Sequence, residues 1–334
     1  QVVLTVLAIS LGLMIICLIG RENLLWLIFG SVEQEVMDNS LIYFLITVIS
    51  YPFLALFNAG AAFYRASGDS KFPMKISVIS NCLNIFGNAI FIYVCHWGVA
   101  GAAFSTLLSR IFCTVVIYWC LRKPKQDIVV NEYHKIRPDM PLILKIMAIG
   151  IPSGIENGMF QFGKLVIQST VSTLGTAAIA AVGVTNQPRL LFFAVFFAMN
   201  IGVTAIVSRR KGQGDRDGAN ECLAQAVAIA LILGVVLCTA AIIVAEPLIA
   251  FAGADEDIFD DAVAYFRIIM AGMLFTSVGM AINAAQRGIG NTKISMITNI
   301  AANLTNCVFN YFLINGIWFF PTLGVRGAAY ATLL

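Results

Sequence analysis

Long apolar segments, each followed by a short polar one, recur from one end of the chain to the other. A helix needs about 20 apolar residues to cross the hydrocarbon core of a bilayer. The segments are uninterrupted and do not alternate with a period of two, which predicts membrane helices and not the strands of an outer-membrane barrel. Nine segments reach this length and a tenth begins at Gly324: 2–20, 41–63, 76–95, 98–121, 146–172, 190–208, 223–245, 262–286 and 294–316. The chain is therefore predicted to be an all-α, polytopic membrane protein.

The composition argues against a soluble protein. A length of 334 residues would suggest two soluble domains, but 59% of the residues are hydrophobic and only 12% are charged. Soluble domains are about 25% charged, so this chain has too little charge to cover two of them. The net charge of +3 is small and divided among loops, which argues against a nucleic-acid partner.

Candidate residues for enzymatic chemistry are missing from the sequence. The eight cysteines lie in or beside apolar segments, form no C-x-x-C pair, and are interpreted as small buried hydrophobes. No Ser-His-Asp set, metal cluster or phosphate-binding loop is visible. We therefore expect neither an enzyme nor a bound cofactor.

Positive charges fall in alternate loops. The intervening loops hold at most one arginine each (Arg21, Arg189 and Arg326), and two of them are acidic. Since lysine and arginine accumulate in cytoplasmic loops, the basic set is predicted to face the cytoplasm. These basic loops are 64–75, 122–145, 209–222 and 287–293.

The chain repeats itself at a constant offset of 222 residues. Arg65 recurs as Arg287 and Gly68 as Gly290, and after a four-residue insertion the small-residue run 98–103 recurs as 324–329. Asparagine stripes recur too, on what we expect to be hydrogen-bonded helix faces: Asn81, Asn84 and Asn88 match Asn303, Asn306 and Asn310. The matching segments lie six crossings apart, so the two copies should have the same orientation.

The repeat predicts two parallel six-helix lobes. We assign 1–121 to a partial N-terminal lobe with four helices, 122–140 to a cytoplasmic linker, and 141–334 to a C-terminal lobe with five helices and the start of a sixth. The offset places the start of the first lobe about 80 residues before Gln1. We therefore expect the sequence to be a fragment that lacks the first two helices.

Segment 146–172 carries the most informative polar residues. Glu156 is the only carboxylate deep inside a predicted span, and we expect it to be buried with few charged partners. It follows Pro152 by one turn and lies at the edge of a polar stripe about 100° wide. The stripe consists of Ser153, Asn157, Gln161, Lys164, Gln168 and Ser172.

Two interpretations of this segment remain open. The stripe either lines a water-filled cavity or meets a polar face on a neighbouring helix. Glu156 is either a protonatable or cation-binding site or a carboxylate that a neighbouring donor ties into helix packing. The candidate substrate- and ion-binding residues are Glu156, Asn157, Gln161, Lys164 and Gln168. Arg110 is a further intramembrane cation beside Lys164 and Arg267, interpreted as a structural counter-charge or a snorkelling side chain.

Several motifs resemble those of the multidrug and toxic compound extrusion (MATE) family. The segment 208–215, Ser-Arg-Arg-Lys-Gly-Gln-Gly-Asp, is similar to the family's Gly-rich loop after the second helix of a lobe. The segments 65–69 and 72–74 resemble its loop after the fourth helix, and 98–103 and 324–329 its G-x-x-G-A-A entry to the sixth. On this mapping the chain runs from the third helix into the twelfth.

The resemblance implies a secondary active antiporter in the bacterial cytoplasmic membrane. Such a protein exports cationic or amphiphilic drugs or toxic metabolites in exchange for H⁺ or Na⁺, contacts membrane lipid, uses no cofactor and works as a monomer. In the family, an acid often follows the seventh-helix proline by about two turns, where this chain has Phe160 and Gln161. The alternatives are a lipid-linked saccharide flippase of the same superfamily and a major-facilitator-type drug antiporter.

Overall fold

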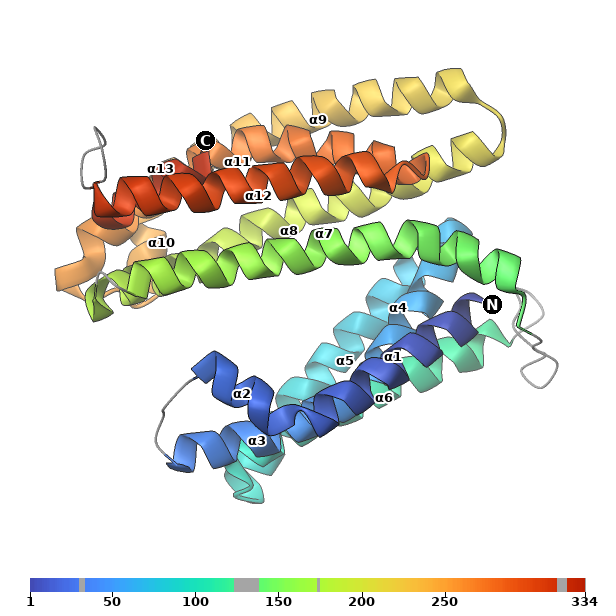
Figure 1. The fold of residues 1–334 in the computed structure, drawn as a ribbon, viewed down its shortest axis with the longest axis horizontal. Coiled ribbons are helices and arrows are strands. Elements are labelled where there is room, and N and C mark those ends of the chain that lie inside the picture. The colour runs from blue at the N-terminus through green and yellow to red at the C-terminus, as the bar shows by residue number, and fades with distance from the viewer. Residues whose placement is uncertain (30–33, 123–137, 173–174, 317–322, 334) are drawn as a thin grey trace. The chain divides into compact units, whose positions relative to one another are not determined.

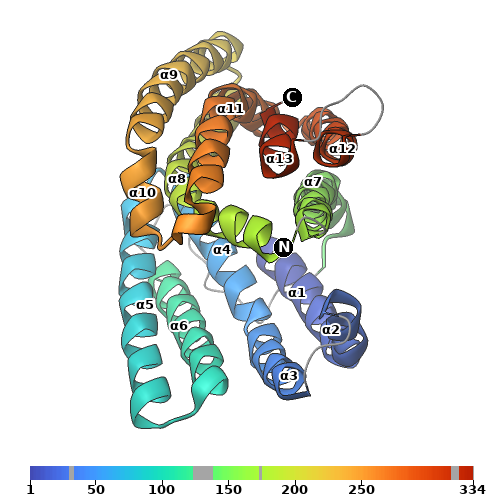
Figure 2. The same ribbon diagram turned by 90° about the vertical axis from the view of Figure 1, so that its left-hand side faces the viewer.

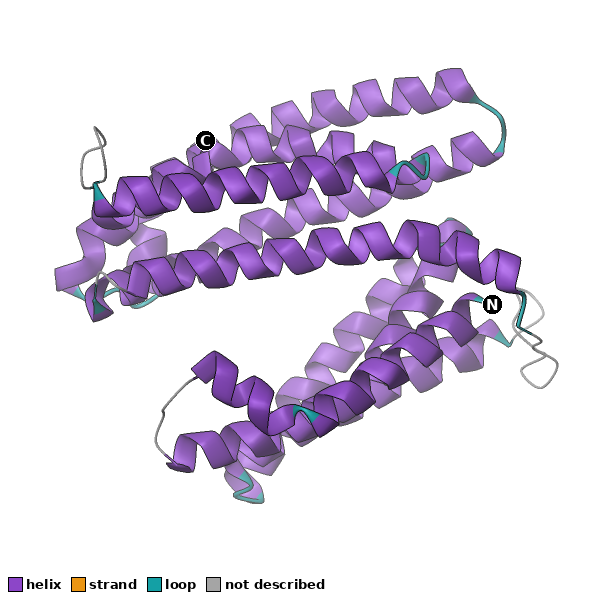
Figure 3. Ribbon diagram, viewed as in Figure 1, coloured by secondary structure: helices purple, strands orange, loops and turns teal. Residues whose placement is uncertain are grey.

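The computed structural model describes residues 1–29, 34–122, 138–172, 175–316 and 323–333. Within these residues the chain is helical between short turns and contains no strand (Figures 1 and 3). The predicted all-α class is therefore confirmed. The chain divides into two compact units, Gln1–Ile146 and Met147–Leu334. Most of the predicted linker 122–140, namely 123–137, lies outside the described residues.

The first unit contains the helices up to residue 121. Long apolar runs form most of them, and the pair α3–α4 bends around Ser50, where Pro52 in the first turn of α4 lacks an amide hydrogen. The predicted single segment 41–63 thus corresponds to two helices. The elements are α1 (Val2–Ile19), α2 (Arg21–Phe29), α3 (Gln34–Ile49), α4 (Tyr51–Ala66), α5 (Lys71–Ala89), the π-helical turn η1 (Ile90–Val94) and α6 (Gly98–Leu121).

The second unit is organised around a buried helix, α11. Figure 2 shows it among α8, α9 and α13, the three helices that it contacts most. The elements are α7 (Met140–Ser172), whose first residues precede the unit boundary, α8 (Thr176–Gly212), α9 (Arg216–Ile243), α10 (Ala245–Phe251), α11 (Glu256–Gly288), α12 (Thr292–Asn315) and α13 (Gly324–Leu333).

Small residues bring α8 and α11 into close contact. A Cβ atom on Gly288 would lie only 2.8 Å from Cβ of Val207 and 3.0 Å from the carbonyl oxygen of Thr204. The hydroxyl groups of Thr204 and Ser208 on α8 donate to the carbonyl oxygens of Ala284 (3.1 Å) and Gly288 (3.0 Å) on α11. These contacts hold α8 and α11 close together and restrict the positions of side chains at the ends of both helices.

Seven described helical segments are long and apolar enough to cross a membrane, counting α3 and α4 as one. Predicted segments 146–172 and 294–316 form α7 and α12, which are long enough but are not among the seven. Their polar residues set them apart: α7 carries the polar stripe and α12 the second asparagine stripe. Polar side chains on such helices need partners or water, so α7 and α12 are where a site is expected.

The predicted start of the segment 190–208 is wrong. The sequence placed Arg189 in a loop before a helix at 190–208, but α8 begins at Thr176 and includes both Pro188 and Arg189. The segment before the proline is rich in alanine, the strongest helix former, and Ala178 and Ala181 pack in the core of the second unit. Helix propensity and packing therefore outweigh the proline and its polar neighbours.

The internal duplication is visible in the local geometry of both units. After α4 and after α11 the chain turns through a glycine with positive φ, Gly68 (+88°) and Gly290 (+81°). Their amides donate to the carbonyl oxygens of Arg65 (3.1 Å) and Arg287 (2.9 Å). Equivalent residues thus close equivalent turns.

The entry to the sixth helix is duplicated as closely. A Cβ on Gly101 would lie 3.0 Å from the carbonyl oxygen of Phe91, and a Cβ on the equivalent Gly327 would lie 2.5 Å from that of Leu313. Both glycines allow α6 or α13 to pack directly on the backbone of the preceding helix. Two equivalent asparagines add side-chain bonds: Asn84 donates to Ser105 Oγ (3.4 Å), and Asn306 to the carbonyl oxygen of Ala331 (2.8 Å). These asparagine pairs confirm the predicted interhelical hydrogen bonds.

Candidate ion and substrate site

A buried ion pair joins α7 to α11 in the second unit. Glu156 on α7 is 8% exposed, and its Oε1 accepts hydrogen bonds from Arg287 Nη1 (2.8 Å) and from Asn299 Nδ2 of α12 (2.6 Å). Arg287 occupies the last turn of α11, directly before the glycine that packs against α8. The close α8–α11 packing therefore holds the guanidinium in place.

Arg287 also reaches α8, where its Nη2 donates to Oδ1 of the buried Asn200 (2.8 Å). Asn283, one turn earlier on α11, donates to Asn299 Oδ1 (3.4 Å). Side chains from four helices thus meet around one carboxylate. The charges of Glu156 and Arg287 compensate each other in a region where a single buried charge would be costly.

The second oxygen of Glu156 has no hydrogen-bond partner. Oε2 is buried, whereas both bonds to the carboxylate go to Oε1. Buried polar atoms are normally satisfied by hydrogen bonds, so this oxygen makes Glu156 the candidate position for a proton or a cation.

Glu156 has one charged partner among the described residues, Arg287, and the sequence did not identify it. The sequence predicted that Arg287 lies in a cytoplasmic loop. In the structure it lies in the last turn of α11, and its guanidinium donates a hydrogen bond to Glu156, 131 residues away in the chain. The repeat drew attention to Arg287 through its match with Arg65. The repeat could not indicate the ion pair between Arg287 and Glu156, because Glu156 lies on a helix outside the matched segments.

The other candidates on α7 lie on a different face from Glu156. Asn157, Gln161, Lys164 and Gln168 are all exposed, and none of them is hydrogen-bonded to Glu156. Asn157 Nδ2 donates to the carbonyl oxygen of Ser153 (2.8 Å), and Lys164 Nζ lies 4.6 Å from the centre of the Phe160 ring. The structure therefore separates the predicted site into a buried ion pair and an exposed polar stripe.

The buried face of α7 is marked by small and polar groups. Gly163, seven residues after Glu156 and on the same face, lies against α12, since a Cβ there would be 2.9 Å from Asn303 Oδ1. Pro152 is also buried, and α7 stays helical through it. Polar contacts to α11 and α12 thus hold this face, together with the core residue Val171 near the end of α7.

Arg110 in the first unit has a simpler environment. Its Nη1 donates to Ser50 Oγ at the bend between α3 and α4. This contact ties α6 to the bend. The partner is a neutral hydroxyl group, so this contact does not decide between the two interpretations of Arg110.

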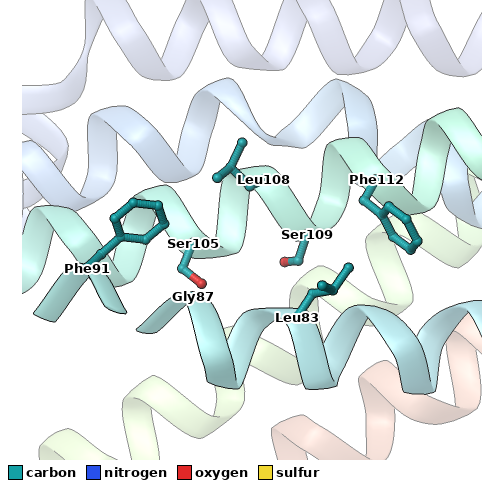
Figure 4. Close-up of a pocket in the computed structure, with 7 residues that line it drawn as sticks. All are labelled: Leu83, Gly87, Phe91, Ser105, Leu108, Ser109 and Phe112. Atoms are coloured by element: carbon teal, nitrogen blue, oxygen red, sulfur yellow. The ribbon is translucent and has the colours of Figure 1, made fainter. Parts of the chain in front are cut away.

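A small pocket in the first unit is mainly apolar (Figure 4). It measures about 220 Å³ and lies between α5, η1 and α6. The hydroxyl groups at its wall donate to backbone carbonyls, Ser105 to that of Asn84 (2.9 Å) and Ser109 to that of Thr106 (2.9 Å). The pocket therefore offers no charged group. Its lining residues are Leu83, Gly87, Phe91, Ser105, Leu108, Ser109 and Phe112.

The Gly-rich loop at 212–215 is a structural element of the second unit. Asp215 caps α9 by accepting a bond from the amide of Gly218 (2.8 Å), and Arg210 Nη1 lies 2.6 Å from its Oδ2. The Gly218 amide and the Arg210 guanidinium lower the pKa of Asp215. Lys211 Nζ donates to the carbonyl oxygen of Ile289, so this loop is joined to the turn after Arg287.

The long apolar helices and the internal repeat indicate a multi-span membrane protein. The family model described as MatE matches residues 1–90 and 152–312, so the chain belongs to the MatE family. The members of this family are transporters and not enzymes, and the membership decides against the major-facilitator alternative.

Comparisons with individual proteins agree with this assignment. The chain is 25% identical over 295 residues to a probable multidrug resistance protein NorM of Thermotoga maritima, covering 87% of this chain. It is 30% identical over 166 residues to an FAD transporter of Shewanella oneidensis, covering 49% of this chain and 36% of that protein. Its fold resembles that of a MOP superfamily transporter from Pyrococcus furiosus, with a TM-score of 0.90 and 22% identity over 99% of this chain and 73% of the other. The chain spans 63% of the length of the Thermotoga protein.

Proposed function

We propose that the full-length protein is a secondary active antiporter that exports drugs or toxic metabolites in exchange for H⁺ or Na⁺. Membership of the MatE family supports this function, as do relatives named for multidrug resistance and for FAD transport. Organic cations and other amphiphiles are the proposed substrates. The protein is proposed to act as a monomer.

The proposal that Glu156 couples transport to an ion rests on the hydrogen bonds of its two carboxylate oxygens. One oxygen accepts both hydrogen bonds, from Arg287 and Asn299, while the other is buried without a partner. A purely structural carboxylate would be expected to use both oxygens. The free Oε2 is therefore the proposed position of the coupling ion.

Ion binding at Oε2 would change the contacts of α7. A proton or Na⁺ there reduces the negative charge that Arg287 and Asn299 share at Oε1, and so weakens both bonds. These bonds are the polar links from Glu156 to α11 and α12. We propose that occupancy of Glu156 controls how firmly α7 is held, and that release of the ion favours substrate binding.

Glu156→Gln tests this proposal because it keeps the shape of the side chain and removes the ionisable group. Ethidium transport would be measured in everted vesicles that contain the full-length protein, with H⁺ and Na⁺ gradients imposed separately. We expect the variant to reach the membrane and to lose more than about 90% of gradient-driven transport. Glu156→Ala should lose transport and also some stability.

Glu246→Gln is the matched control. Glu246 belongs to the same unit and pairs with Arg267 (2.9 Å), but its side chain is 62% exposed. This variant should transport ethidium like the wild type. Wild-type transport by Glu156→Gln at normal expression would assign Glu156 to helix packing, and the gradient that drives transport in the wild type would identify the ion.

A further inference from the structure

We propose that Asn200 on α8 keeps one oxygen of Glu156 free for the coupling ion, because it holds the Arg287 guanidinium in a position where it bonds the other oxygen. Asn200 is thus a positioning residue: it contacts Arg287, and the described hydrogen bonds to Glu156 come from other side chains. This inference rests on the proposed function and adds the residue that leaves the ion site open.

The ion pair between Arg287 and Glu156 uses fewer bonds than a guanidinium allows. An arginine often binds a carboxylate through two parallel N–H···O bonds, one to each oxygen. Here Nη1 donates to Oε1 (2.8 Å), while Oε2 is buried and has no partner in the described structure. A bond from Nη2 would satisfy Oε2, so the absence of this bond requires another acceptor for Nη2.

Asn200 is that acceptor. Its Oδ1 lies 2.8 Å from Nη2 of Arg287, the same distance that separates Nη1 from Oε1 of Glu156. Asn200 is 7% exposed, so little water reaches it. One guanidinium is therefore divided between a neutral amide and a carboxylate.

The packing of α8 on α11 fixes Asn200. Thr204, one turn later on α8, donates from Oγ1 both to the carbonyl oxygen of Asn200 (2.9 Å) and to that of Ala284 on α11 (3.1 Å). The amide of Asn200 thus lies beside a direct contact between the two helices.

The Arg287 side chain extends back along α11 to reach Asn200. Thr204 contacts Ala284 and Ser208 contacts the residue after Arg287, so the two helices run in the same direction and Asn200 lies nearer the start of α11. An arginine near a helix end commonly extends toward the headgroups instead. The amide and the carboxylate together hold this guanidinium inside the unit.

A second arginine of this unit is divided in the same way, with a different consequence. Arg267 donates to Glu246 (2.9 Å) and to the carbonyl oxygen of Ile242 (3.4 Å), but the side chain of Glu246 is 62% exposed and open to water. The Glu156 side chain is 10% exposed, the lowest value for a carboxylate among the described ion pairs. Dividing the guanidinium therefore leaves an oxygen without water only at Glu156.

Removal of the Asn200 acceptor would release Nη2 of Arg287. The freed N–H group would bond Oε2 of Glu156 and give the common pair with two bonds. This bond occupies the position proposed for the ion. The ion would then have to displace a charge-assisted hydrogen bond before it could bind.

Asn200→Ala tests this role through the ion. Ethidium transport would be measured in everted vesicles that contain the full-length protein, at increasing concentrations of the ion that drives the wild type. We expect the half-saturating concentration of the ion to rise about tenfold, because the ion competes with one added charge-assisted bond, and the KM for ethidium to stay the same. An unchanged half-saturating concentration would overturn the proposal.

Two variants of α8 serve as controls. Asn200→Asp keeps an acceptor oxygen for Nη2, so the half-saturating concentration of the ion should not rise. Thr185→Val removes a buried hydroxyl group that bonds within α8, to the carbonyl oxygen of Val182 (2.8 Å), and should leave ion dependence unchanged. A rise in either control as large as in Asn200→Ala would contradict the role of the acceptor.

A double-mutant cycle tests the geometry without transport, and it applies even if Asn200→Ala is inactive. The melting temperature of the full-length protein in detergent would be compared with and without Asn200→Ala, in the wild type and in Glu156→Gln. If Nη2 moves to Oε2, the loss should be smaller in the wild type, because a glutamine side chain has a single acceptor oxygen. Equal losses in both backgrounds would overturn the rearrangement.

The two experiments separate the role of Asn200 from the proposed export function. Wild-type transport by Glu156→Gln, with unequal losses in the cycle, would reject the ion site and retain Asn200 as the residue that orients Arg287. Loss of transport in Glu156→Gln, with unchanged ion dependence in Asn200→Ala and equal losses in the cycle, would retain the ion site and reject the role of Asn200.

Discussion

Arg65 and Arg287 occupy equivalent positions in the two units, yet their surroundings differ. Each ends a helix and precedes a turn closed by a positive-φ glycine. Arg287 binds Glu156 and Asn200, whereas the Arg65 guanidinium has no hydrogen bond or ion pair within the described part of the chain. The two arginines therefore lie at equivalent helix ends but have different polar and charged neighbours among the described residues.

The difference between Arg65 and Arg287 shows which contacts recur in both copies of the repeat. The turn glycines, the small residues at the start of α6 and α13, and the asparagine bonds recur because they join segments within the repeat, and we call these shared contacts the repeated frame. The partners of Arg287 come from α7 and α8, which have no counterpart in this chain at the offset of 222 residues. The recurring contacts are thus those within the repeated segments, whereas the ion pair also depends on side chains of α7 and α8.

Replacing Arg287 and replacing Arg65 should give the largest difference in the free energy of unfolding. Arg287→Gln leaves Glu156 buried without a counter-charge and should lower the free energy of unfolding by about 3–5 kcal/mol. Arg65→Gln removes a cation that has no hydrogen bond or ion pair among the described residues, and on these contacts it should change the free energy of unfolding by less than about 1 kcal/mol. Denaturant unfolding of the purified full-length protein in detergent measures both.

The pair Glu156→Gln/Arg287→Gln provides the control for this comparison. If the loss in Arg287→Gln comes from an uncompensated carboxylate, the double variant should recover most of it. Equal losses of unfolding free energy for Arg65→Gln and Arg287→Gln would mean that both arginines stabilise the protein through the contacts that recur in the repeat, and not through Glu156.

The glycines of the frame should respond equally in the two units. Gly101→Ala and Gly327→Ala would each place a Cβ against the backbone of the preceding helix, at 3.0 Å or less. We expect each to lower the free energy of unfolding by about 1–3 kcal/mol. Gly154→Ala on α7, where a Cβ would meet no atom within 4 Å, is the control and should cost nothing. A large loss for only one of the two frame glycines would contradict the equivalence of the repeats.

Much of this frame could be predicted from the sequence. Uninterrupted apolar runs indicated the helices, and the recurrence of Gly68 as Gly290 and of 98–103 as 324–329 indicated equivalent turns. These features are local, so the residue pattern contains them directly. The start of α8 was missed because Pro188 and Arg189 resemble a loop, whereas the alanine-rich segment before them packs in the core.

The candidate site was less accessible to sequence reasoning. The position of Glu156 in an apolar segment indicated a buried carboxylate, and burial at 8% exposure agrees with that. Its partner Arg287 is brought close only by the packing of α7, α8, α11 and α12, and no periodicity encodes that contact.

The smallest expected effect concerns the first turns of α5 and α12, which the repeat also makes equivalent. Asp69 Oδ1 accepts hydrogen bonds from the amides of Lys71 and Phe72 (both 3.1 Å), whereas the equivalent Asn291 makes no capping bond with its side chain. Asp69→Ala should therefore lower the free energy of unfolding by about 1 kcal/mol, and Asn291→Ala by only a few tenths. Thermal unfolding of both variants beside the wild type measures the difference. Equal losses would show that Asn291 caps α12 in solution, and that the frame is duplicated more completely than the hydrogen bonds indicate.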